Sequence, residues 1–247
     1  MEEIIAGKHA VLEALRSGRT VNKIWLAQGS APHQLQAVVE EAKKLGVMYQ
    51  FVDRRKLDQM VDKDIRHQGV IAQAAPYEYA DLEDLFQVAE ERGEAPFFVI
   101  LDEIEDPHNL GSVIRTVECA GAHGVIIPKR RSAQVTAVVA KTSAGAAAFV
   151  PVARVSNLAQ AIDALKQRGV WIAGADAAAE QTAYDADLTG PLAIVIGSEG
   201  RGLSRLIREK CDYLVKLPLL GRIQSLNASV AAGILLYEAV RQRTARG

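Results

Sequence analysis

The chain has 247 residues, of which 49% are hydrophobic and 24% are charged, and its formal net charge is -1. This length allows one large domain or two smaller ones, each with its own hydrophobic core. No segment reaches the roughly 18 uninterrupted apolar residues of a membrane-spanning helix, and the first residues are acidic where a signal peptide would be basic. The composition therefore predicts a globular cytoplasmic protein that is neither secreted nor embedded in a membrane.

The two cysteines, Cys119 and Cys211, are too few for a disulfide framework. They fall in segments with the patterns of a helix and of a strand edge, so we expect reduced, buried thiols. The chain has no C-x-x-C, no H-E-x-x-H and no Ser/His/Asp signature. The sequence therefore predicts no metal site and argues against covalent catalysis.

The charge is unevenly distributed along the chain. The net charge is +2 in residues 1–75, -6 in residues 76–95 and +3 in residues 96–247. Such a short acidic segment between two blocks of different rhythm is typical of a connection. We therefore predict a small domain at 1–75, an acidic linker at 76–95 with a short helix from Leu82 to Glu91, and a larger domain at 96–247.

Two basic clusters, at residues 54–56 and 129–131, have the composition of segments that follow a phosphate backbone. Clusters of this size are also common in solvated loops. Charge alone therefore leaves contact with nucleic acid open.

The first block alternates short apolar runs with helical patterns. The expected strands are 23–27, 48–52 and 69–74, and the expected helices are 9–16, 33–45 and 55–61. This alternation predicts a small α/β domain.

The second block continues the alternation over a longer stretch. Strands are expected at 97–101, 124–127, near 150, and at 170–174, 192–196 and 213–217, with helices from 110, 133, 158 and 227. Apolar strands separated by helices indicate a parallel sheet covered on both faces. Such sheets bind ligands at the carboxyl ends of their strands, so the loops after Leu101, Ile196 and Leu217 are the expected site.

The loop after Leu101 leads into a helix with Asn109 as its predicted N-cap. Four apolar residues at helical spacing predict its buried stripe: Leu110, Val113, Ile114 and Val117. Three residues are expected on another face: Ser112, Arg115 and Cys119. A capped surface helix with one solvent-facing arginine would also fit this pattern.

The loop after Ile196 reads Gly-Ser-Glu-Gly-Arg-Gly-Leu over residues 197–203. Its glycine spacing matches neither the dinucleotide fingerprint nor the P-loop, and glycine allows a ligand to approach bare backbone. Glu199 is either a helix-terminal charge or a functional carboxylate. After Leu217, Ser225 and Asn227 precede the last helix, where both can cap it and donate hydrogen bonds.

These three motifs, in this order, closely resemble those of the SpoU (TrmH) class of SPOUT RNA ribose 2′-O-methyltransferases. The resemblance covers about residues 97–243, and the segments 7–11 and 67–70 look like the L30e-like substrate-binding domain of many members. It implies an α/β fold with a SPOUT-type parallel sheet, a C-terminal trefoil knot and a small N-terminal L30e-like α/β domain. General topology rules argue against a knot, so this expectation comes from the family alone.

The resemblance also implies the chemistry. S-adenosyl-L-methionine would be held in the knot by backbone at Gly197, Leu217 and Leu226, and the active site would form across a homodimer. Further site residues follow by motif: the catalytic residue would be Arg115, and Asn109, Glu199, Ser225 and Asn227 would shape the site around the ribose and its phosphate. The expected reaction is methylation of a ribose 2′-hydroxyl in RNA, with a guanosine of 23S ribosomal RNA favoured as the target.

Arginine is an unusual proton acceptor, because deprotonating an ordinary guanidinium at pH 7 costs roughly 7 kcal/mol. Arg115 would therefore either be desolvated and accept the proton, or stay charged, clamp the phosphate and stabilise the developing alkoxide. A transfer RNA substrate and a non-catalytic RNA-binding dimer are the alternatives to the favoured reaction. A dinucleotide-dependent enzyme would need a G-x-G-x-x-G after its first strand, and the chain has none.

Overall fold

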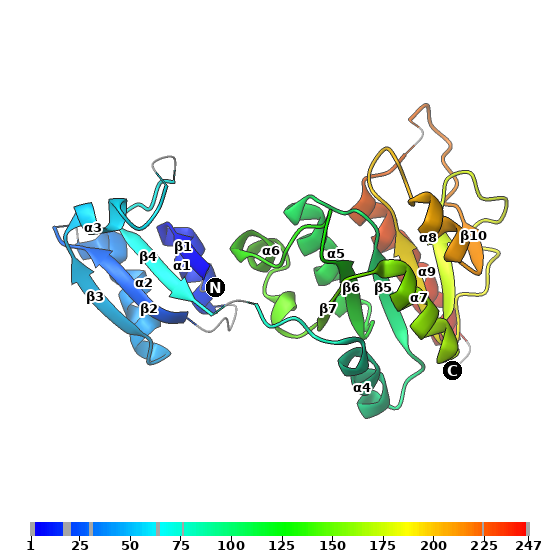
Figure 1. The fold of residues 1–247 in the computed structure, drawn as a ribbon, viewed down its shortest axis with the longest axis horizontal. Helices are drawn as coiled ribbons and strands as arrows, with labels where there is room; N and C mark the ends of the chain where they lie inside the picture. Colours follow the sequence, from blue (N-terminus) through cyan, green and yellow to red (C-terminus); the bar gives the residue numbers. More distant parts are fainter. Residues whose placement is uncertain are drawn as a thin grey trace. The chain divides into compact units, whose positions relative to one another are not determined.

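A computed structural model describes residues 3–16, 21–29, 32–62, 65–75, 77–223 and 225–245. The chain forms two compact units (Figure 1). The first combines Met1–Glu78 with Val135–Ala148, and the second combines Tyr79–Gln134 with Phe149–Gly247. No helix within the described ranges is both long and apolar enough to cross a membrane.

The first unit is built on a four-stranded mixed sheet with the order β1-β4-β2-β3. Its strands are β1 (Glu3–Ala6), β2 (Val21–Ala27), β3 (Met48–Val52) and β4 (Val70–Ala74). Strand β4 pairs antiparallel with β1 and β2, and β2 pairs in parallel with β3. The sequence did not predict β1, because four residues before a glycine are too few to show a strand period.

The helices of the first unit are α1 (Lys8–Arg16), α2 (Pro32–Lys44), α3 (Arg54–Asp58) and α6 (Ala137–Thr142), followed by the short 3-10 helix η1 (Ala146–Ala148). Helices α1 and α2 pack together, and Val11, Leu15 and Val38 enter the core. Helix α6 contacts α1, although the two helices lie far apart in the sequence. The expected α/β character of the N-terminal block is confirmed.

The second unit contains a six-stranded, fully parallel sheet with the order β10-β8-β9-β5-β6-β7. The strands are β5 (Phe97–Leu101), β6 (Gly124–Pro128), β7 (Val152–Val155), β8 (Trp171–Ala175), β9 (Leu192–Ile196) and β10 (Tyr213–Val215). Every residue of β5 and β9 is buried. The predicted parallel sheet covered on both faces is therefore confirmed.

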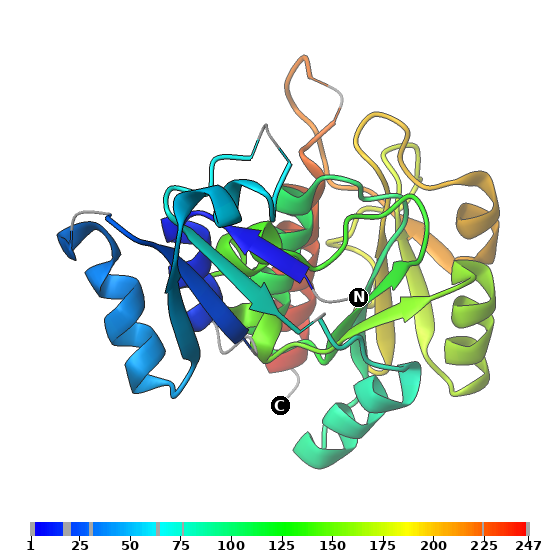
Figure 2. The same ribbon diagram turned by 60° about the vertical axis from the view of Figure 1, so that its left-hand side comes forward.

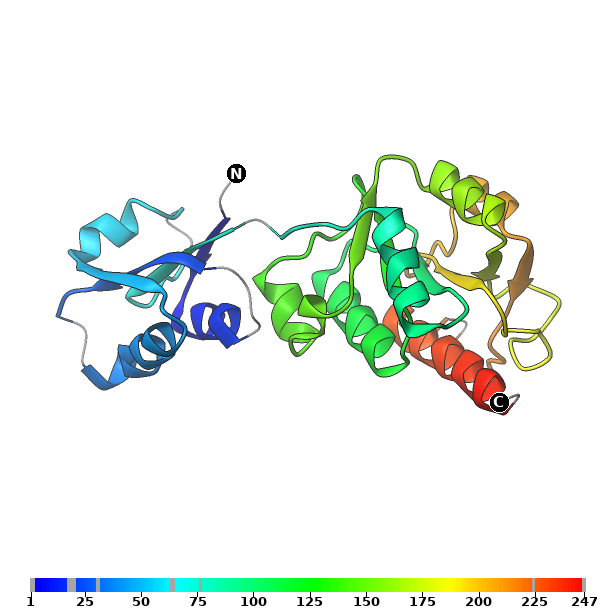
Figure 3. The same ribbon diagram turned by 90° about the horizontal axis from the view of Figure 1, so that it is seen from below.

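Helices cover both faces of this sheet, in two layers that Figure 3 separates. The helices are α4 (Leu82–Arg92), α5 (Pro107–Cys119), α7 (Leu158–Gln167), α8 (Arg205–Lys210) and α9 (Ala228–Ala245). Helices α4, α7 and α8 share one core with Phe98 and Ile100 of β5. Helices α5 and α9 pack side by side on the opposite face.

The acidic segment contributes to a core as well as connecting the two blocks. Helix α4 begins after Asp81, which forms a capping box with Asp84. Its Leu85 and Phe86 pack into the second unit, where the Phe86 ring meets the edge of Phe98. The helix expected at Leu82 is thus present and buried along one side.

The predicted burial of both thiols is wrong. Cys119 lies in the last turn of α5 with its side chain exposed, and Cys211 is half-buried after α8. Burial raises the pKa of the Cys211 thiol to about 12, so it stays protonated. Both cysteines are free thiols.

Candidate active site at the carboxyl edge of the parallel sheet

Helix α5 places Asn109 in its first turn. Asp106 is the N-cap, its Oδ1 accepting a 2.7 Å hydrogen bond from the His108 N–H, and Pro107 takes the first helical position. The prediction that Asn109 caps this helix is therefore wrong. Its side chain is instead buried, 8% exposed, and is free to bond to other segments. The predicted apolar stripe is confirmed, since Leu110, Val113, Ile114 and Val117 are fully buried.

The glycine loop after β9 closes on itself. Ser198 and Gly202 exchange two backbone hydrogen bonds of 3.0 and 2.8 Å, while Gly200 and Gly202 adopt left-handed φ angles of 82° and 66°. A Cβ on Gly197 would collide with the backbone of Gly202 and Leu203. The glycine at 197 is thus needed for the loop to fold back on itself, whereas the sequence had suggested only an approach for a ligand.

Glu199, at the turn of this loop, joins the first and third motifs. Its Oε1 accepts hydrogen bonds from Asn109 Nδ2 at 2.9 Å, from Asn227 Nδ2, and from the backbone N–H of Ala228 at 3.2 Å. Asn227 Nδ2 also donates to Asn109 Oδ1 at 2.9 Å. The carboxylate therefore lies at the N-terminus of α9, where the helix dipole favours negative charge, and closes a three-residue network.

Asn227 caps α9 as expected. Its Oδ1 accepts hydrogen bonds from the backbone N–H groups of Ser229 at 3.0 Å and Val230 at 3.2 Å. Because Oδ1 takes the helix donors, Nδ2 is directed at Asn109 and Glu199. One side chain thus fixes the start of the last helix and its position relative to the other two loops.

A pocket of ≈ 430 Å³ adjoins this network. It is bounded by the loops after β8, β9 and β10 and by the first turns of α9. The loops after β9 and β10 rise from the same end of the sheet (Figure 2). Its lining includes the three predicted cofactor-binding residues and two further predicted site residues: Gly197, Leu217, Leu226, Glu199 and Ser225. Much of the remaining lining is apolar, with Leu219, Ala231 and Leu235.

Arg115 is not among the residues that line this pocket. It lies on the exposed side of α5 and, among the described residues, makes no hydrogen bond or ion pair. Ser225 lines the pocket but is exposed and does not cap α9. The single chain therefore joins Asn109, Glu199 and Asn227 by hydrogen bonds, and the Arg115 side chain is not part of this network.

Comparison with known proteins decides the family. The sequence profile described as "SpoU rRNA Methylase family" matches residues 96–237, and the profile "RNA 2′-O ribose methyltransferase substrate binding" matches residues 4–80. The chain belongs to the SpoU rRNA methylase family. The resemblance inferred from the three motifs is thus confirmed, and the protein is a SpoU/TrmH RNA methyltransferase.

Relatives match over nearly their full length. A protein of Bacillus subtilis (strain 168) named for the TrmH family of tRNA/rRNA methyltransferases, YacO, is 54% identical over 99% of this chain and 98% of its own. A TrmH family counterpart from Staphylococcus haemolyticus is 50% identical over 98% and 97%. The solved structure of the SpoU methyltransferase AviRb from Streptomyces viridochromogenes, in complex with the cofactor AdoMet, aligns with a TM-score of 0.77, 27% identity, and 98% and 91% coverage.

The SpoU pocket of this chain has the features required by S-adenosylmethionine. Its volume lies within the range of small-molecule sites, roughly 300–1,000 Å³, and the Gly197 loop exposes backbone donors and acceptors to it. The apolar lining suits an adenine ring, while Glu199, Ser225 and Arg208 supply polar groups. Among the described residues, no three His, Cys, Asp or Glu side chains are grouped to hold a metal ion.

Sequence reasoning missed two carboxylates that directly follow strands. Asp102, after β5, is 5% exposed and accepts a 2.7 Å hydrogen bond from the Ser204 N–H, which anchors the far end of the glycine loop. Asp176, after β8, pairs with Arg208, and both line the pocket. An aspartate immediately after a buried strand was the available signal, because that position lies at the ligand edge.

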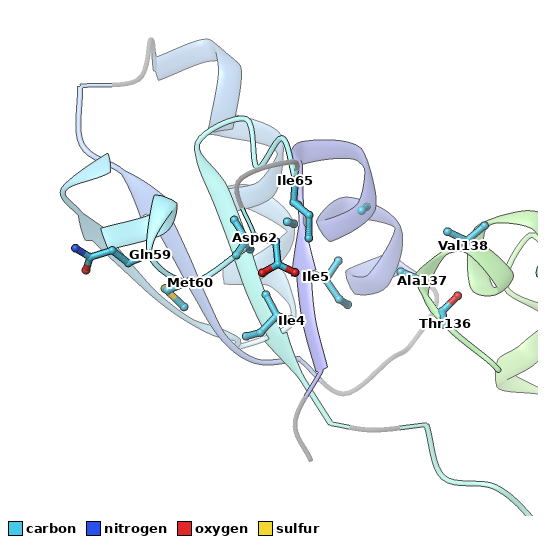
Figure 4. A pocket seen from close by; sticks show the side chains of 12 residues that line it. Ile4, Ile5, Gln59, Met60, Asp62, Ile65, Thr136, Ala137 and Val138 are labelled. Carbon is cyan, nitrogen blue, oxygen red and sulfur yellow. The ribbon is translucent and has the colours of Figure 1, made fainter. Parts of the chain in front are cut away.

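The first unit has a pocket of its own, of ≈ 540 Å³ (Figure 4). Ile4 and Ile5 of β1 line it together with Met60, Ile65 and the single carboxylate of Asp62. Residues from the 136–138 segment complete the lining. Like the pocket of the second unit, it is lined mainly by apolar groups.

Proposed function

We propose that this SpoU protein methylates a ribose 2′-hydroxyl in RNA, with a guanosine of 23S ribosomal RNA as the favoured target. The observation that carries the proposal is the network of Asn109, Glu199 and Asn227 beside a pocket bounded by a glycine loop. Three segments far apart in sequence meet there through specific side-chain hydrogen bonds. Such pre-ordered polar groups beside a small-molecule pocket are expected of an active site.

S-adenosylmethionine is the methyl donor in this proposal and supplies an activated methyl group on a positively charged sulfur. The residues proposed to hold it are Gly197, Leu217 and Leu226, mainly through their backbone groups. Asn109, Glu199, Ser225 and Asn227 are proposed to shape the site around the ribose and its phosphate. Their contribution is to align the hydroxyl with the methyl group, since orientation supplies much of the rate in a two-substrate reaction.

Arg115 is proposed to act on the 2′-hydroxyl. It either accepts the proton in a desolvated site or stays charged and stabilises the developing alkoxide. The exposure of Arg115 in the single chain favours the second version, because the first version requires a desolvated side chain. Desolvation by RNA and by a second subunit would be needed for the first.

A homodimer would complete the site. The exposed side of the α5–α9 layer carries Arg115 together with an apolar row on α9, where Val230, Ile234 and Tyr237 are 49%, 38% and 51% exposed. Residues at this spacing lie on one face of a helix, and an exposed apolar face is typical of a subunit contact. A second copy packed on this face would bring Arg115 to an interface.

The trefoil knot is a further part of the proposal. The segment after β10 lies against the loop after β8, since Lys216 N–H donates to Gln181 O at 3.0 Å and Ala183 N–H donates to Lys216 O at 2.9 Å. These bonds support a close association of the loops that the knot would require.

We also propose a division of roles along the chain. Residues 1–75 would bind substrate RNA, residues 76–95 would link the two domains, and residues 96–247 would catalyse methyl transfer. The protein is proposed to act in the cytoplasm.

The test is transfer of radiolabelled methyl from S-adenosylmethionine to unmodified ribosomal RNA and, in parallel, to bulk transfer RNA, followed by digestion to nucleosides. Label on ribose in ribosomal RNA is the expected result. Label on ribose only in transfer RNA would replace the favoured substrate with the alternative one. RNA binding without transfer or cofactor binding would favour a non-catalytic RNA-binding dimer.

Substitution of Arg115 tests its role. Arg115→Ala should leave cofactor binding near the wild-type level and lower methyl transfer at least 100-fold, because the residue acts on the hydroxyl and does not line the pocket. Arg115→Lys tests whether the charge alone stabilises the developing alkoxide, since lysine keeps the positive charge but lacks the planar guanidinium. Full activity of Arg115→Ala would remove the residue from the mechanism.

A further inference from the structure

Glu103 connects two arginines from different loops of the second unit. Its Oε1 accepts a 2.9 Å hydrogen bond from Arg131 Nη1, and its Oε2 lies 3.8 Å from Arg201 Nη2. Glu103 follows β5, Arg131 follows β6, and Arg201 belongs to the glycine loop after β9. Because β9, β5 and β6 are neighbours in the parallel sheet, these loops meet at its carboxyl edge.

The carboxylate is held in place by the segments on both sides of it. Asp102 binds the Ser204 N–H at the end of the glycine loop, and the Ile104 carbonyl accepts a 2.8 Å hydrogen bond from the Ala133 N–H beyond Arg131. Glu103 and Arg131 have φ angles of 56° and 53°, in the left-handed region that L-residues rarely adopt. Such conformations persist where the surroundings enforce them, often at functional sites.

The two guanidinium groups remain accessible. The Arg131 and Arg201 side chains are 73% and 74% exposed, whereas Glu103 is 18% exposed beneath them. Their exposed donors can therefore bind an external acceptor while the carboxylate orients them. The pKa of Arg131 is raised by its hydrogen bond to Glu103 and by the charges of Glu103 and Glu105, so the group stays protonated.

The cations at this position are consecutive in one loop. Lys129 and Arg130 precede Arg131 after β6, and Arg201 adds a fourth cation from the glycine loop, while the acidic residues belong mainly to the loop after β5, where Glu103 lies beneath the two arginines. A planar guanidinium matches a phosphate oxygen pair in two parallel hydrogen bonds. Arg201 also lines the cofactor pocket, whereas Arg131 does not, so the pair extends outward from the pocket.

We propose that Glu103 positions Arg131 and Arg201 as a two-arginine clamp for the phosphodiester backbone of substrate RNA beside the cofactor pocket. This inference rests on the proposed function. Arg131 and Arg201 are the binding groups, and Glu103 is a positioning residue. The clamp would hold the strand next to the target ribose without reading its sequence, because phosphate contacts position the nucleic acid and base contacts specify it.

The first experiment measures binding of an unmodified ribosomal RNA transcript to the full chain at several salt concentrations. The Arg131→Ala/Arg201→Ala double variant should weaken binding roughly tenfold near 0.15 M salt and reduce the slope of log K against log salt by about 1.5, since each lost phosphate contact removes about 0.7–0.9. Cofactor binding should not change in the Arg131→Ala single variant, because Arg131 does not line the pocket. An unchanged slope in the double variant overturns the clamp, and a loss of cofactor binding in the single variant assigns Arg131 to the cofactor instead.

Arg92→Ala is the matched control. This exposed arginine bonds to the Gly121 carbonyl and lies before β5, at the amino edge of the sheet. Its substitution removes the same charge from the opposite edge, so it should leave the salt slope unchanged. If Arg92→Ala lowered the salt slope as much as the loss of one clamp arginine, the slope would report the overall charge of the protein. That result would overturn the assignment of Arg131 and Arg201 as the phosphate clamp.

The second experiment separates positioning from simple charge. Glu103→Gly suits the left-handed backbone, so the variant should fold, as a melting curve would verify. If Glu103 only repelled RNA, its removal would lower the KM for RNA; if it orders the arginines, the KM should rise about threefold. The increase should disappear in the Arg131→Ala/Arg201→Ala background. An unchanged or lower KM overturns the positioning role.

The two proposals fail in different ways. If the wild-type protein binds RNA and the double variant loses slope, but no methyl is transferred, the clamp stands and the proposed reaction fails. If methyl is transferred and the variants behave like the wild type, the reaction stands and the clamp fails. A wild-type protein that binds no RNA overturns both.

Discussion

The two units of the chain offer ligands very different surfaces. In the second unit, β5 and β9 are buried along their whole length, and the accessible polar groups gather in the loops beyond their carboxyl ends. In the first unit, β3 is an edge strand, with Met48 66% and Phe51 49% exposed. The basic residues of α3 lie close to this edge in sequence and are also exposed.

This difference follows from how each sheet is covered. A parallel sheet with helices on both faces leaves only its strand ends accessible, so a site there is small, enclosed and built from loops. The mixed sheet of the first unit has its own pocket of ≈ 540 Å³ and also offers a broad exposed surface along the edge strand β3. The second unit is therefore suited to hold a small molecule and align a reaction, and the first to contact a large partner through its surface.

The largest expected effect comes from adding one methyl group to the glycine loop. Gly197→Ala places a Cβ against the backbone of Gly202 and Leu203, so the loop must shift, at a cost of about 1–3 kcal/mol. We expect a clearly lower melting temperature and cofactor affinity reduced at least 100-fold by calorimetry. Gly221→Ala is the control, because a Cβ there meets nothing within 4 Å. Similar behaviour of the two variants would show that the loop is not constrained at Gly197.

A smaller effect is expected at the carboxylate that joins the three loops. Glu199→Gln keeps the shape but removes the charge that accepts from Asn109, Asn227 and the α9 N-terminus. Methyl transfer should fall about tenfold or more, with a stability loss of about 1 kcal/mol. Glu209→Gln, whose carboxylate pairs only with the exposed Arg205 in the described chain, should change neither by much. Wild-type transfer by Glu199→Gln would reduce the network to a structural role.

The first unit should respond in RNA binding alone. Simultaneous substitution of Arg54, Arg55 and Lys56 by alanine should weaken binding to ribosomal RNA and lower the salt slope by up to about 2.5, because each phosphate contact contributes about 0.7–0.9. Cofactor affinity should be unchanged. Alanine at Lys43 and Lys44 of α2 removes exposed charge elsewhere in the unit and is the control. If both sets lower the slope equally, the binding surface is not localised on α3.

The smallest effect is a pH dependence of stability in the second unit. His123 is 1% exposed; its Nδ1 accepts a hydrogen bond from the Phe97 N–H, and Nε2 bonds to Glu94. Burial is the main reason that the pKa of His123 lies below its ordinary value of 6.5. The unfolded chain therefore takes up a proton first as pH falls below 6.5, and stability declines until the folded pKa is reached.

Melting temperatures measured from pH 8 to pH 5 would test this sign. The decrease below pH 6.5 should be smaller in a His123→Gln variant, which has no titrating ring. A wild-type protein whose stability increased on acidification through this range, relative to the variant, would contradict the assignment. This pH effect distinguishes the two units, because it should destabilise the second unit and leave the charge of α3 in the first unit unchanged.

Much of the architecture could be predicted from periodicity. The apolar runs at 97–101 and 192–196 coincide with β5 and β9, and the stripe from Leu110 to Val117 is buried as expected. The short strand β1 was missed, because four residues do not complete a recognisable strand period. The sequence prediction put the N-cap of α5 at Asn109, whereas the structure has it at Asp106. Both residue types cap helices, and Pro107 at the first helical position marks where the helix starts.

The sequence by itself determined the family, the parallel sheet and the three loops in which chemistry was to be sought. Only the tertiary structure showed that Asn109, Glu199 and Asn227 share one network and that Glu103 joins Arg131 to Arg201. It also showed that Arg115 does not line the pocket of a single chain. The physical reason is range: strand and helix periods are local and visible in a few residues, whereas contacts across roughly 30 to 120 residues depend on the order in which strands assemble in the sheet.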